Sequence, residues 1–480
     1  MKNLICFILV LSLITANVIA QTEGCTIGVI SGFASSDGRP VLFKNRDSQE
    51  LQQRLGFFSD PSWNYSYLGV YSLSSTNVPT MGINSAGLAV GNSAVAQDTG
   101  IYERDYENGP MAGFIMSNFE DAEQVRGFLA YQNIFRLSGC FPFIDAKGNA
   151  VMLEVLKPRD TSEPRWIWTY NADDSLRNLH GLLGIVPRAN EFHEIEYGLD
   201  NISIEGRYKT NRLNLMGLRD LNMLNPRTII QGNNGSGGYE VIRYGPYRPL
   251  ESISKNVSQS AIIAHGVMPG EDPALSILWV VLGQSDYCIA VPAWVRVGDN
   301  IHPSLKLGSM WNRSRSLYDK YSYAGTIQAS IFPAETHIFD MVYNEIMPHW
   351  REIGLPSIAD MVRVHYQIAD DAYSLLYCLD KTRYTNKAPV ISPVTVEEIS
   401  STGFNFSVTA SDNDGEIVSW SWDFGDGSSS TKESTGHTYN EEGTYLVSCT
   451  VTDNEDVSIT SWRYITINAT PVADIAIKDD

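Results

Sequence analysis

The sequence has 480 residues and a mass of 53.3 kDa, a length that suits about three domains. Its 43% hydrophobic and 19% charged residues are typical of a globular protein with a sizeable core. Acidic side chains outnumber basic ones by 55 to 35, which gives a formal charge of -20. Bulk electrostatics therefore argue against nucleic acid or an anionic membrane surface as the main partner.

The first twenty residues have the pattern of an export signal. A short positive start precedes an almost wholly apolar run over residues 4–20, which ends in the small residue Ala20. We therefore expect residues 1–20 to be a signal peptide and the protein to be secreted, either extracellular or periplasmic. No membrane insertion is expected after the signal is removed, because no later apolar run reaches the length of a membrane helix.

The spacing of apolar residues predicts a layered α+β body rather than a regular alternation of strands and helices. In chain order, we expect strands over residues 26–32, 40–44 and 81–94, an amphipathic helix over 119–131, a strand hairpin at 141–144 and 150–156, a helix over 207–222, buried strands at 261–267, 277–282 and 287–295, and a helix over 358–377.

The composition changes near Lys387, after which short strands with Asp/Gly turns replace the helical periodicity. Trp422 and Phe424 alternate toward a core before a tight Gly-Asp-Gly turn, and His-Thr-Tyr and Gly-Thr-Tyr follow. These residues resemble a PKD (polycystic kidney disease) domain, an all-β immunoglobulin-like sandwich, over residues 387–470. The resemblance implies a spacer or an accessory module with a carbohydrate or protein ligand.

Metal chemistry is not indicated by any motif. Asp412, Asp414 and Glu416 lie close together in the C-terminal module, but they lack the spacing of a calcium loop and favour a solvated turn. Neither His-Glu-x-x-His nor Cys-x-x-Cys occurs, so we expect no metal site and no cofactor.

Cys25 lies just beyond the expected signal cleavage site. If residues 21–24, a short propeptide, are also removed, the mature chain begins with a thiol and a free α-amine on one residue. Their ordinary pKa values, about 8.5 and about 7.7–8.0, allow proton exchange between them near neutral pH. A cysteine in a secreted protein is more often half of a disulfide, but the polar strand that follows favours a nucleophile.

That strand carries Lys44, Arg46 and Asp47. The carboxylate of Asp47 could orient the α-amine, and either Lys44 or Arg46 could favour the thiolate. These residues, with the Gly-Ile-Asn-Ser-Ala-Gly-Leu segment that begins at Gly82, resemble the N-terminal-nucleophile (Ntn) cysteine hydrolases of the isopenicillin N acyltransferase and carcinine hydrolase type, with choloylglycine hydrolases as more distant relatives.

The resemblance implies a four-layer αββα catalytic body, which we expect over residues 25–385. It implies that Cys25 is the nucleophile and that Asp47 holds its amine. It also implies that Asn190 donates to the oxyanion, with Asn92 as a second contributor, and that Arg207 is an active-site arginine. Lys44 occupies the place of the usual arginine, which leaves open whether Lys44 or Arg46 serves the thiol.

The expected activity is hydrolysis or acyl transfer on a linear amide C–N bond through a thioester. The expected substrate is a small amide or a peptide, and processing exposes the nucleophile. One alternative is a dipeptidase of the same superfamily, whose Trp-Val-x-Leu-Gly strand is similar to residues 279–283. Another is a non-catalytic adhesion or binding protein that uses the PKD module.

Overall fold

The computed structural model describes residues 25–35, 37–73, 78–94, 108–131, 139–156, 166–173, 185–188, 257–321 and 324–468. The chain divides into two compact units, residues 1–328 and 329–480. The expected signal peptide, the expected propeptide and the helix predicted over residues 207–222 lie outside the described residues.

The first unit contains a six-stranded antiparallel sheet in the order β11-β1-β2-β12-β13-β14. Every residue of its strands β1, β2, β12 and β13 is buried, as expected for a sheet covered on both faces. Its strands are β1 (Thr26–Ile30), β2 (Val41–Asp47), β11 (Ile185–Arg188), β12 (Ser258–His265), β13 (Ile277–Leu282) and β14 (Val291–Ala293).

An eight-stranded antiparallel sheet packs against the first, with β1 and β2 in contact with β8. The predicted hairpin is present as β8 and β9. The strands are β3 (Gln53–Phe58), β4 (Tyr67–Ser72), β5 (Pro79–Asn84), β6 (Ala89–Val90), β7 (Ser93–Ala94), β8 (Gly139–Ile144), β9 (Ala150–Leu156) and β10 (Trp166–Asn171).

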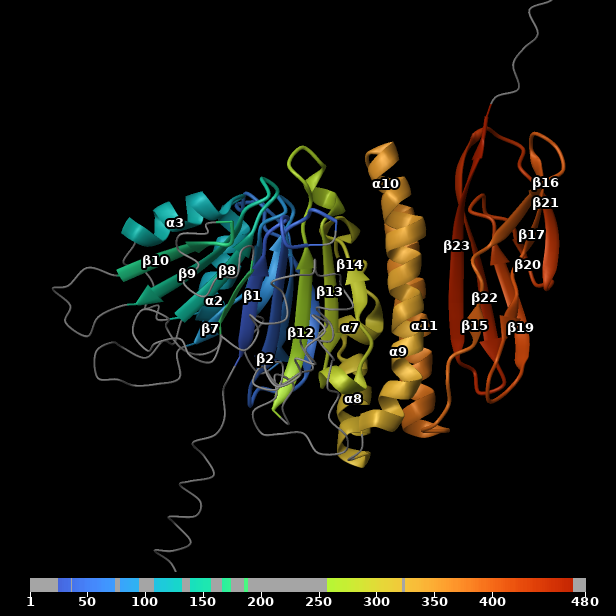
Figure 1. Cartoon of the computed structure of the whole chain (residues 1–480), viewed down its shortest axis with the longest axis horizontal. Helices are drawn as coiled ribbons and strands as arrows, with labels where there is room; N and C mark the ends of the chain where they lie inside the picture. The colour runs from blue at the N-terminus through green and yellow to red at the C-terminus, as the bar shows by residue number, and fades with distance from the viewer. Residues whose placement is uncertain are drawn as a thin grey trace, which may run out of the picture. The chain divides into compact units, whose positions relative to one another are not determined.

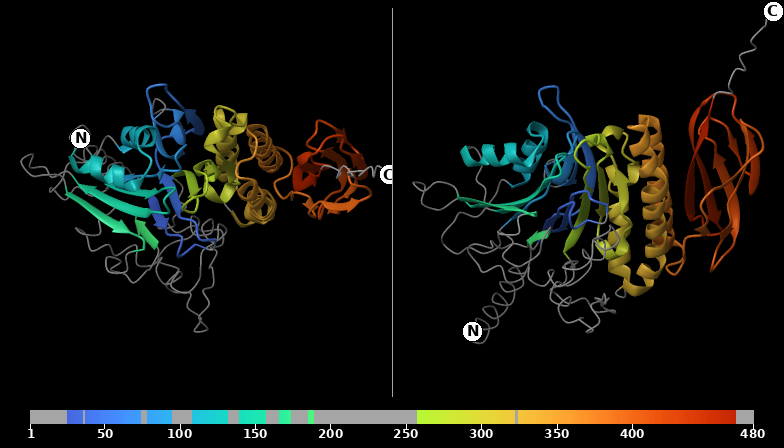
Figure 2. Two further views of the ribbon diagram at one scale, coloured as in Figure 1. Left: turned by 90° about the horizontal axis from the view of Figure 1, so that it is seen from above. Right: turned by 45° about the horizontal axis from the view of Figure 1, so that its top comes forward.

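Helices cover the outer faces of both sheets, which gives the predicted four-layer αββα body (Figures 1 and 2). Helices α2 (Asn108–Asn118) and α3 (Ala122–Tyr131) pack on the eight-stranded sheet, where Ile115 and Leu129 join a core with Phe141 and Leu153. Helix α8 (Ser309–Lys320), preceded by the short α7 (Pro303–Lys306), packs on β13 of the other sheet.

One predicted strand is wrong. Residues 287–295 were expected to form a buried strand, but a 3₁₀ turn occupies Ser285–Tyr287 and only Val291–Ala293 is a strand. Gln284 caps the turn by accepting a hydrogen bond from the Asp286 amide. An apolar run of this length predicts burial but does not distinguish a strand from buried irregular backbone.

The second unit combines helices with a β-sandwich. The helical segments are α9 (Ala324–Asp340), the π-helix η6 (Met341–Ile346), α10 (Met347–Ile353) and the predicted long helix, α11 (Ile358–Lys381). The strands are β15 (Val390–Ile391), β16 (Thr395–Glu398), β17 (Gly403–Ser407), β18 (Ala410–Ser411), β19 (Ile417–Asp423), β20 (Ser429–Ser430), β21 (Ser434–Thr438), β22 (Gly443–Asp453) and β23 (Ser458–Ile467).

Polar contacts join α9 and α11 to β23 within this unit. His337 and the Thr460 carbonyl lie 2.8 Å apart, and the Thr460 hydroxyl donates to Asp371 at 3.1 Å. The sandwich core contains Phe406, Trp422 and Trp462, so the aromatic alternation read from the sequence does point inward. Strand β23 of the sandwich therefore packs against helices of the same unit.

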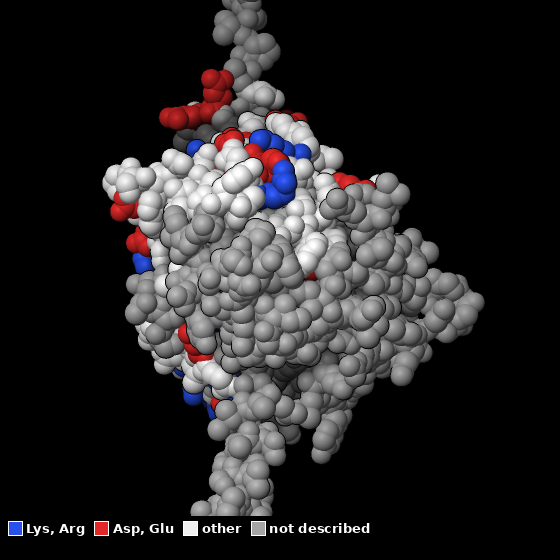
Figure 3. All heavy atoms as spheres, turned by 90° about the vertical axis from the view of Figure 1, so that its left-hand side faces the viewer, with Lys and Arg blue, Asp and Glu red and all other residues white. Residues whose placement is uncertain are grey.

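Charged groups of opposite sign are interspersed on the described part of the face in Figure 3. Ion pairs of this kind join Glu123 with Arg126, and Asp121 with Lys147. No helix among the described residues is both long and apolar enough to cross a membrane.

Candidate functional site

Cys25 directly precedes β1 and is partly buried. The pairing of Thr26 with Asn45 places Cys25 across from Arg46, at the edge where β2 ends. The Cys25 thiol donates a long contact, 3.9 Å, to the backbone carbonyl of Asp47. Among the described residues, no disulfide involves any of the five cysteines, so Cys25 is not half of a disulfide with the others.

Lys44 lies on the same face of the strand pair as Cys25 and is only 1% exposed. Its amine donates to the Asn92 side-chain oxygen at 2.5 Å and to the Thr80 carbonyl at 3.2 Å. Burial lowers the pKa of Lys44 to about 8. The nearby Arg46 also lowers this pKa, whereas Cys25 raises it. The structure thus brings together Cys25, Lys44 and Asn92.

Arg46 is engaged elsewhere. Its guanidinium donates to Gln53 at 2.7 Å and to the carboxylate of Glu50 at 2.6 Å. An arginine paired with a carboxylate has much of its charge neutralised locally. Of the two cations considered from the sequence, Lys44 is therefore the one beside Cys25 that makes no ion pair with a carboxylate in the described part of the chain.

Asp47 is buried at the end of β2, and a polar network holds its side chain. Its Oδ1 accepts from Asn45 at 2.9 Å and from the Ser258 hydroxyl at 2.5 Å. Ser285 in turn donates to the Asn45 side-chain oxygen at 3.5 Å. The sequence analysis missed Ser258 and Ser285, and no local signal could reveal them, because both are more than 200 residues from Asp47.

The other two predicted site residues, Asn190 and Arg207, lie outside the described residues. Five of the seven predicted positions are therefore placed by the structure, all of them on β2, next to β1, or between β6 and β7. Cys25, Lys44, Arg46, Asp47 and Asn92 lie in or beside the two facing sheets of the first unit.

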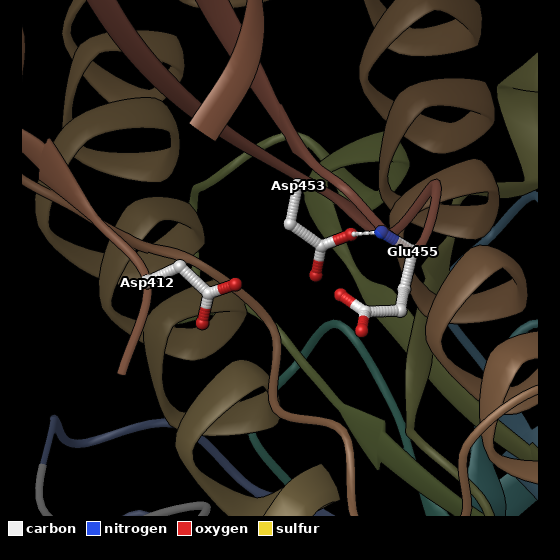
Figure 4. A group of neighbouring side chains, drawn as sticks. All are labelled: Asp412, Asp453 and Glu455. Atoms are coloured by element: carbon white, nitrogen blue, oxygen red, sulfur yellow. Dashed lines mark hydrogen bonds between the residues drawn. The ribbon is translucent and has the colours of Figure 1, made fainter. Parts of the chain in front are cut away.

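A second polar cluster lies in the C-terminal unit, where carboxylates of Asp412, Asp453 and Glu455 converge (Figure 4). One ligand oxygen from each lies within 4.8 Å of the others. Burial raises the pKa of Asp412 and of Asp453, and neighbouring carboxylates raise both further. The solvated turn predicted from the sequence fits Glu416, which is exposed. Asp412 is half-buried and faces Asp453, at the end of β22, and Glu455, in the turn that follows.

Asn386 borders this cluster. It is fully buried and donates to Asp453 at 3.1 Å, while its own side-chain oxygen accepts no hydrogen bond from any described residue. Arg383 is the neighbouring cation, and it binds Glu455 at 3.0 Å. Calcium and magnesium prefer oxygen ligands such as carboxylates, so Asp412, Asp453 and Glu455 could hold a hard divalent cation.

Residues 386–467 match the PKD domain family. The C-terminal sandwich is a PKD domain. The prediction made from its Trp-Asp-Phe-Gly-Asp-Gly segment is thereby confirmed. A microbial collagenase from Vibrio alginolyticus is 46% identical over 63 residues, which are 13% of this chain and 8% of the collagenase. The chain thus spans less than a tenth of the length of that curated relative.

Two solved structures are similar to a larger part of the chain. Penicillin V acylase from Agrobacterium tumefaciens is 12% identical with a TM-score of 0.32, and the match covers 56% of this chain and 86% of the acylase. Conjugated bile acid hydrolase from Clostridium perfringens is 13% identical with a TM-score of 0.34, and the match covers 56% of this chain and 92% of the hydrolase.

Proposed function

We propose that this protein is a secreted cysteine amidohydrolase or acyltransferase that acts on linear amide C–N bonds through the N-terminal Cys25. The observation that carries the proposal is that the partly buried thiol of Cys25, at the start of β1, lies on the same face as the buried Lys44 of β2, whose described hydrogen-bond partners include no carboxylate. Burying a charged lysine costs free energy unless an opposite charge lies nearby. In the proposed mechanism the thiolate of Cys25 is that opposite charge.

The reaction has two steps. After processing at Gly24–Cys25, the α-amine of Cys25 takes the thiol proton, and the thiolate attacks the amide carbonyl. The α-ammonium then protonates the departing nitrogen as the C–N bond breaks and the thioester forms. Water attacks the thioester in hydrolysis, or another amine attacks it in transfer, and the thiol is restored.

Asn92 is suited to the oxyanion. Lys44 can only donate, so its bond to Asn92 fixes the side-chain oxygen on that side and turns the amide N–H groups away from Lys44. An N–H group presented in this way can donate to the oxygen that becomes negative when the carbonyl is attacked. Asn190 and Arg207 remain proposed contributors from the resemblance.

Substrates are proposed from the chemistry as small N-acyl amides or peptides, with no cofactor. A dipeptidase is the alternative within this mechanism, and a non-catalytic adhesion protein is the alternative outside it. The PKD domain is proposed to bind a carbohydrate or a protein.

The test combines the mature N-terminus with a pair of variants. N-terminal sequencing of the exported protein should return Cys25, and Cys25→Ser should lower amide turnover by at least about 1,000-fold. Cys378→Ala is the control, because burial raises the pKa of that thiol to about 11 and keeps it unreactive. Full activity in Cys25→Ser, or a mature chain that begins at Gln21, contradicts the proposal; parallel panels of dipeptides and acylated amines separate the two catalytic alternatives.

A second function is favoured by one observation, the convergence of three carboxylates in which Asp412 Oδ2 and Glu455 Oε2 are buried and accept no hydrogen bond from any described residue. We propose that the PKD domain binds a divalent cation there. Calorimetric titration of the full chain with calcium tests this, and an absence of heat at millimolar calcium contradicts it.

A further inference from the structure

The strand pair β2 and β12 contains one irregularity, and it lies beside Asp47. Ser260 pairs with Arg46, yet Ser258 rather than Gln259 pairs with Asp47, so β12 has one extra residue at this point. A bulge of this kind redirects a side chain and is common next to active sites. In a regular ladder, Gln259 would stand opposite Asp47.

The bulge delivers a hydroxyl to the carboxylate. The Ser258 hydroxyl accepts a hydrogen bond from Asn45 at 3.1 Å and donates its single proton to Asp47 at 2.5 Å. Asn45 donates to the same carboxylate oxygen at 2.9 Å. Both donors therefore hold Oδ1, and the carboxylate is locked in one orientation within a fully buried network.

The surrounding backbone holds the bulge in place. The amide of Ser48, which follows Asp47, donates to the Val257 carbonyl at 3.0 Å. On the other side of β12, the Gly283 amide donates to the Gln259 carbonyl at 2.8 Å. The position of the Ser258 hydroxyl is thus fixed from both neighbouring strands.

We propose that Ser258 is a positioning residue for catalysis, which holds the Asp47 carboxylate in the orientation that binds the α-amine of Cys25. This inference rests on the proposed function, in which that amine is the general base. A carboxylate without this hydroxyl samples other rotamers, and a base misplaced by about 1 Å costs up to roughly 100-fold in rate.

The alternative role for Ser258 is purely structural, in which its hydroxyl only satisfies a buried carboxylate. Ser258→Thr and Ser258→Val separate the two roles, since these side chains have nearly the same shape and differ in the hydroxyl. Ser260→Ala is the matched control, because it removes a buried serine hydroxyl two residues away on the same strand, 3.4 Å from Gln53.

We expect Ser258→Val to lower kcat by about 10- to 100-fold with KM within about twofold of the wild type, because in the proposed mechanism Asp47 holds the α-amine and not the substrate. Ser258→Thr should recover kcat to within about threefold, and Ser260→Ala should stay within about twofold. Equal kcat in the Thr and Val variants overturns the inference, as does a loss that appears in KM alone. If Cys25→Ser retains turnover, the proposed function fails instead, so the two failures are distinguishable.

Discussion

The two units of this chain each contain a cluster of buried or half-buried polar side chains, and the clusters differ in how their charges are arranged. Around Asp47, neutral donors from Asn45 and Ser258 both meet one oxygen of a single carboxylate. In the PKD domain, Asp412, Asp453 and Glu455 face one another with Arg383 on one side. The first cluster surrounds a single carboxylate with neutral donors, whereas the second gathers three carboxylates beside one arginine.

The difference follows from the backbone that supplies each cluster. Asp47 and Ser258 are paired residues of neighbouring strands, where the ladder fixes their separation. Asp412 lies between β18 and β19, and Glu455 lies in the turn between β22 and β23. Loop ends can adjust to an ion of a given radius, which suits a cation site better than a site that must hold a proton acceptor rigidly.

The largest expected effect tests whether the first cluster needs the negative charge of Asp47. Asp47→Asn keeps the side-chain shape but removes the negative charge that favours the α-ammonium of Cys25, so amide turnover should fall by about 1,000-fold. Asp60→Asn, an exposed aspartate before β4, is the control. Thermal unfolding should change little in either variant. Wild-type turnover in Asp47→Asn would show that the cluster only stabilises the sheet.

Asp371 shows whether neutral hydrogen-bond donors are enough to keep a buried carboxylate ionised. Gln367 and Thr460 both donate to its Oδ1, yet burial dominates and raises its pKa to about 7. Its ordinary value is 3.8, so the folded state holds this proton more tightly than the unfolded state. The stability from this group is therefore present below about pH 4 and is lost as the pH rises through 7.

Asp371→Asn should remove that dependence. The variant should be more stable than the wild type at pH 8.5, by on the order of 2 to 4 kcal/mol, and similar to it near pH 4. Hydrogen exchange of β23 amides in the full chain measures the difference, with Glu442→Gln, an exposed acid of the same unit, as the control. A constant difference between variant and wild type at all pH values contradicts this assignment.

Adding a cation tests whether the carboxylates of the PKD cluster lack a positively charged partner. Calcium at about 100 times its Kd should raise the free energy of unfolding of the C-terminal unit by about 2.7 kcal/mol. Asp453→Asn should abolish the increase, while the exposed Asp456→Asn should retain it. Because the pKa values of Asp412 and Asp453 are raised, protons compete with the ion, and affinity should increase with pH. An equal increase in all three proteins places the ion elsewhere.

The sequence predicted the parts of the molecule whose signals are local. Helix α11 and the sandwich strands follow from apolar spacing and turn residues, and the hairpin of β8 and β9 follows from its Asp-Ala-Lys-Gly turn. The PKD domain was identifiable from one contiguous aromatic segment. The strand predicted over residues 287–295 failed because burial alone does not fix backbone conformation.

The candidate site could be predicted only along single strands. Cys25, Lys44 and Asp47 are separated by 22 residues at most, and a polar strand after a strand-like apolar segment marks them. Ser258 and the pairing of Asp412 with Asp453 depend on a bulge and on loop ends, which residue spacing does not encode. The different surroundings of Lys44 and Arg46 depend on Asn92, Glu50 and Gln53, which residue spacing does not reveal.

The smallest expected effect concerns Lys44, which lies beside Cys25 and has no carboxylate among its described contacts. Its pKa is about 8, so the amine loses its charge, and its support of the thiolate, as the pH rises through that value. The activity should therefore decline on the alkaline side near pH 8. Lys44→Arg keeps the charge at all accessible pH values, so the alkaline decline should move to higher pH while turnover at pH 7 stays within about threefold. A pH profile of kcat/KM measures this, and an unchanged alkaline limb assigns the decline to a group other than Lys44.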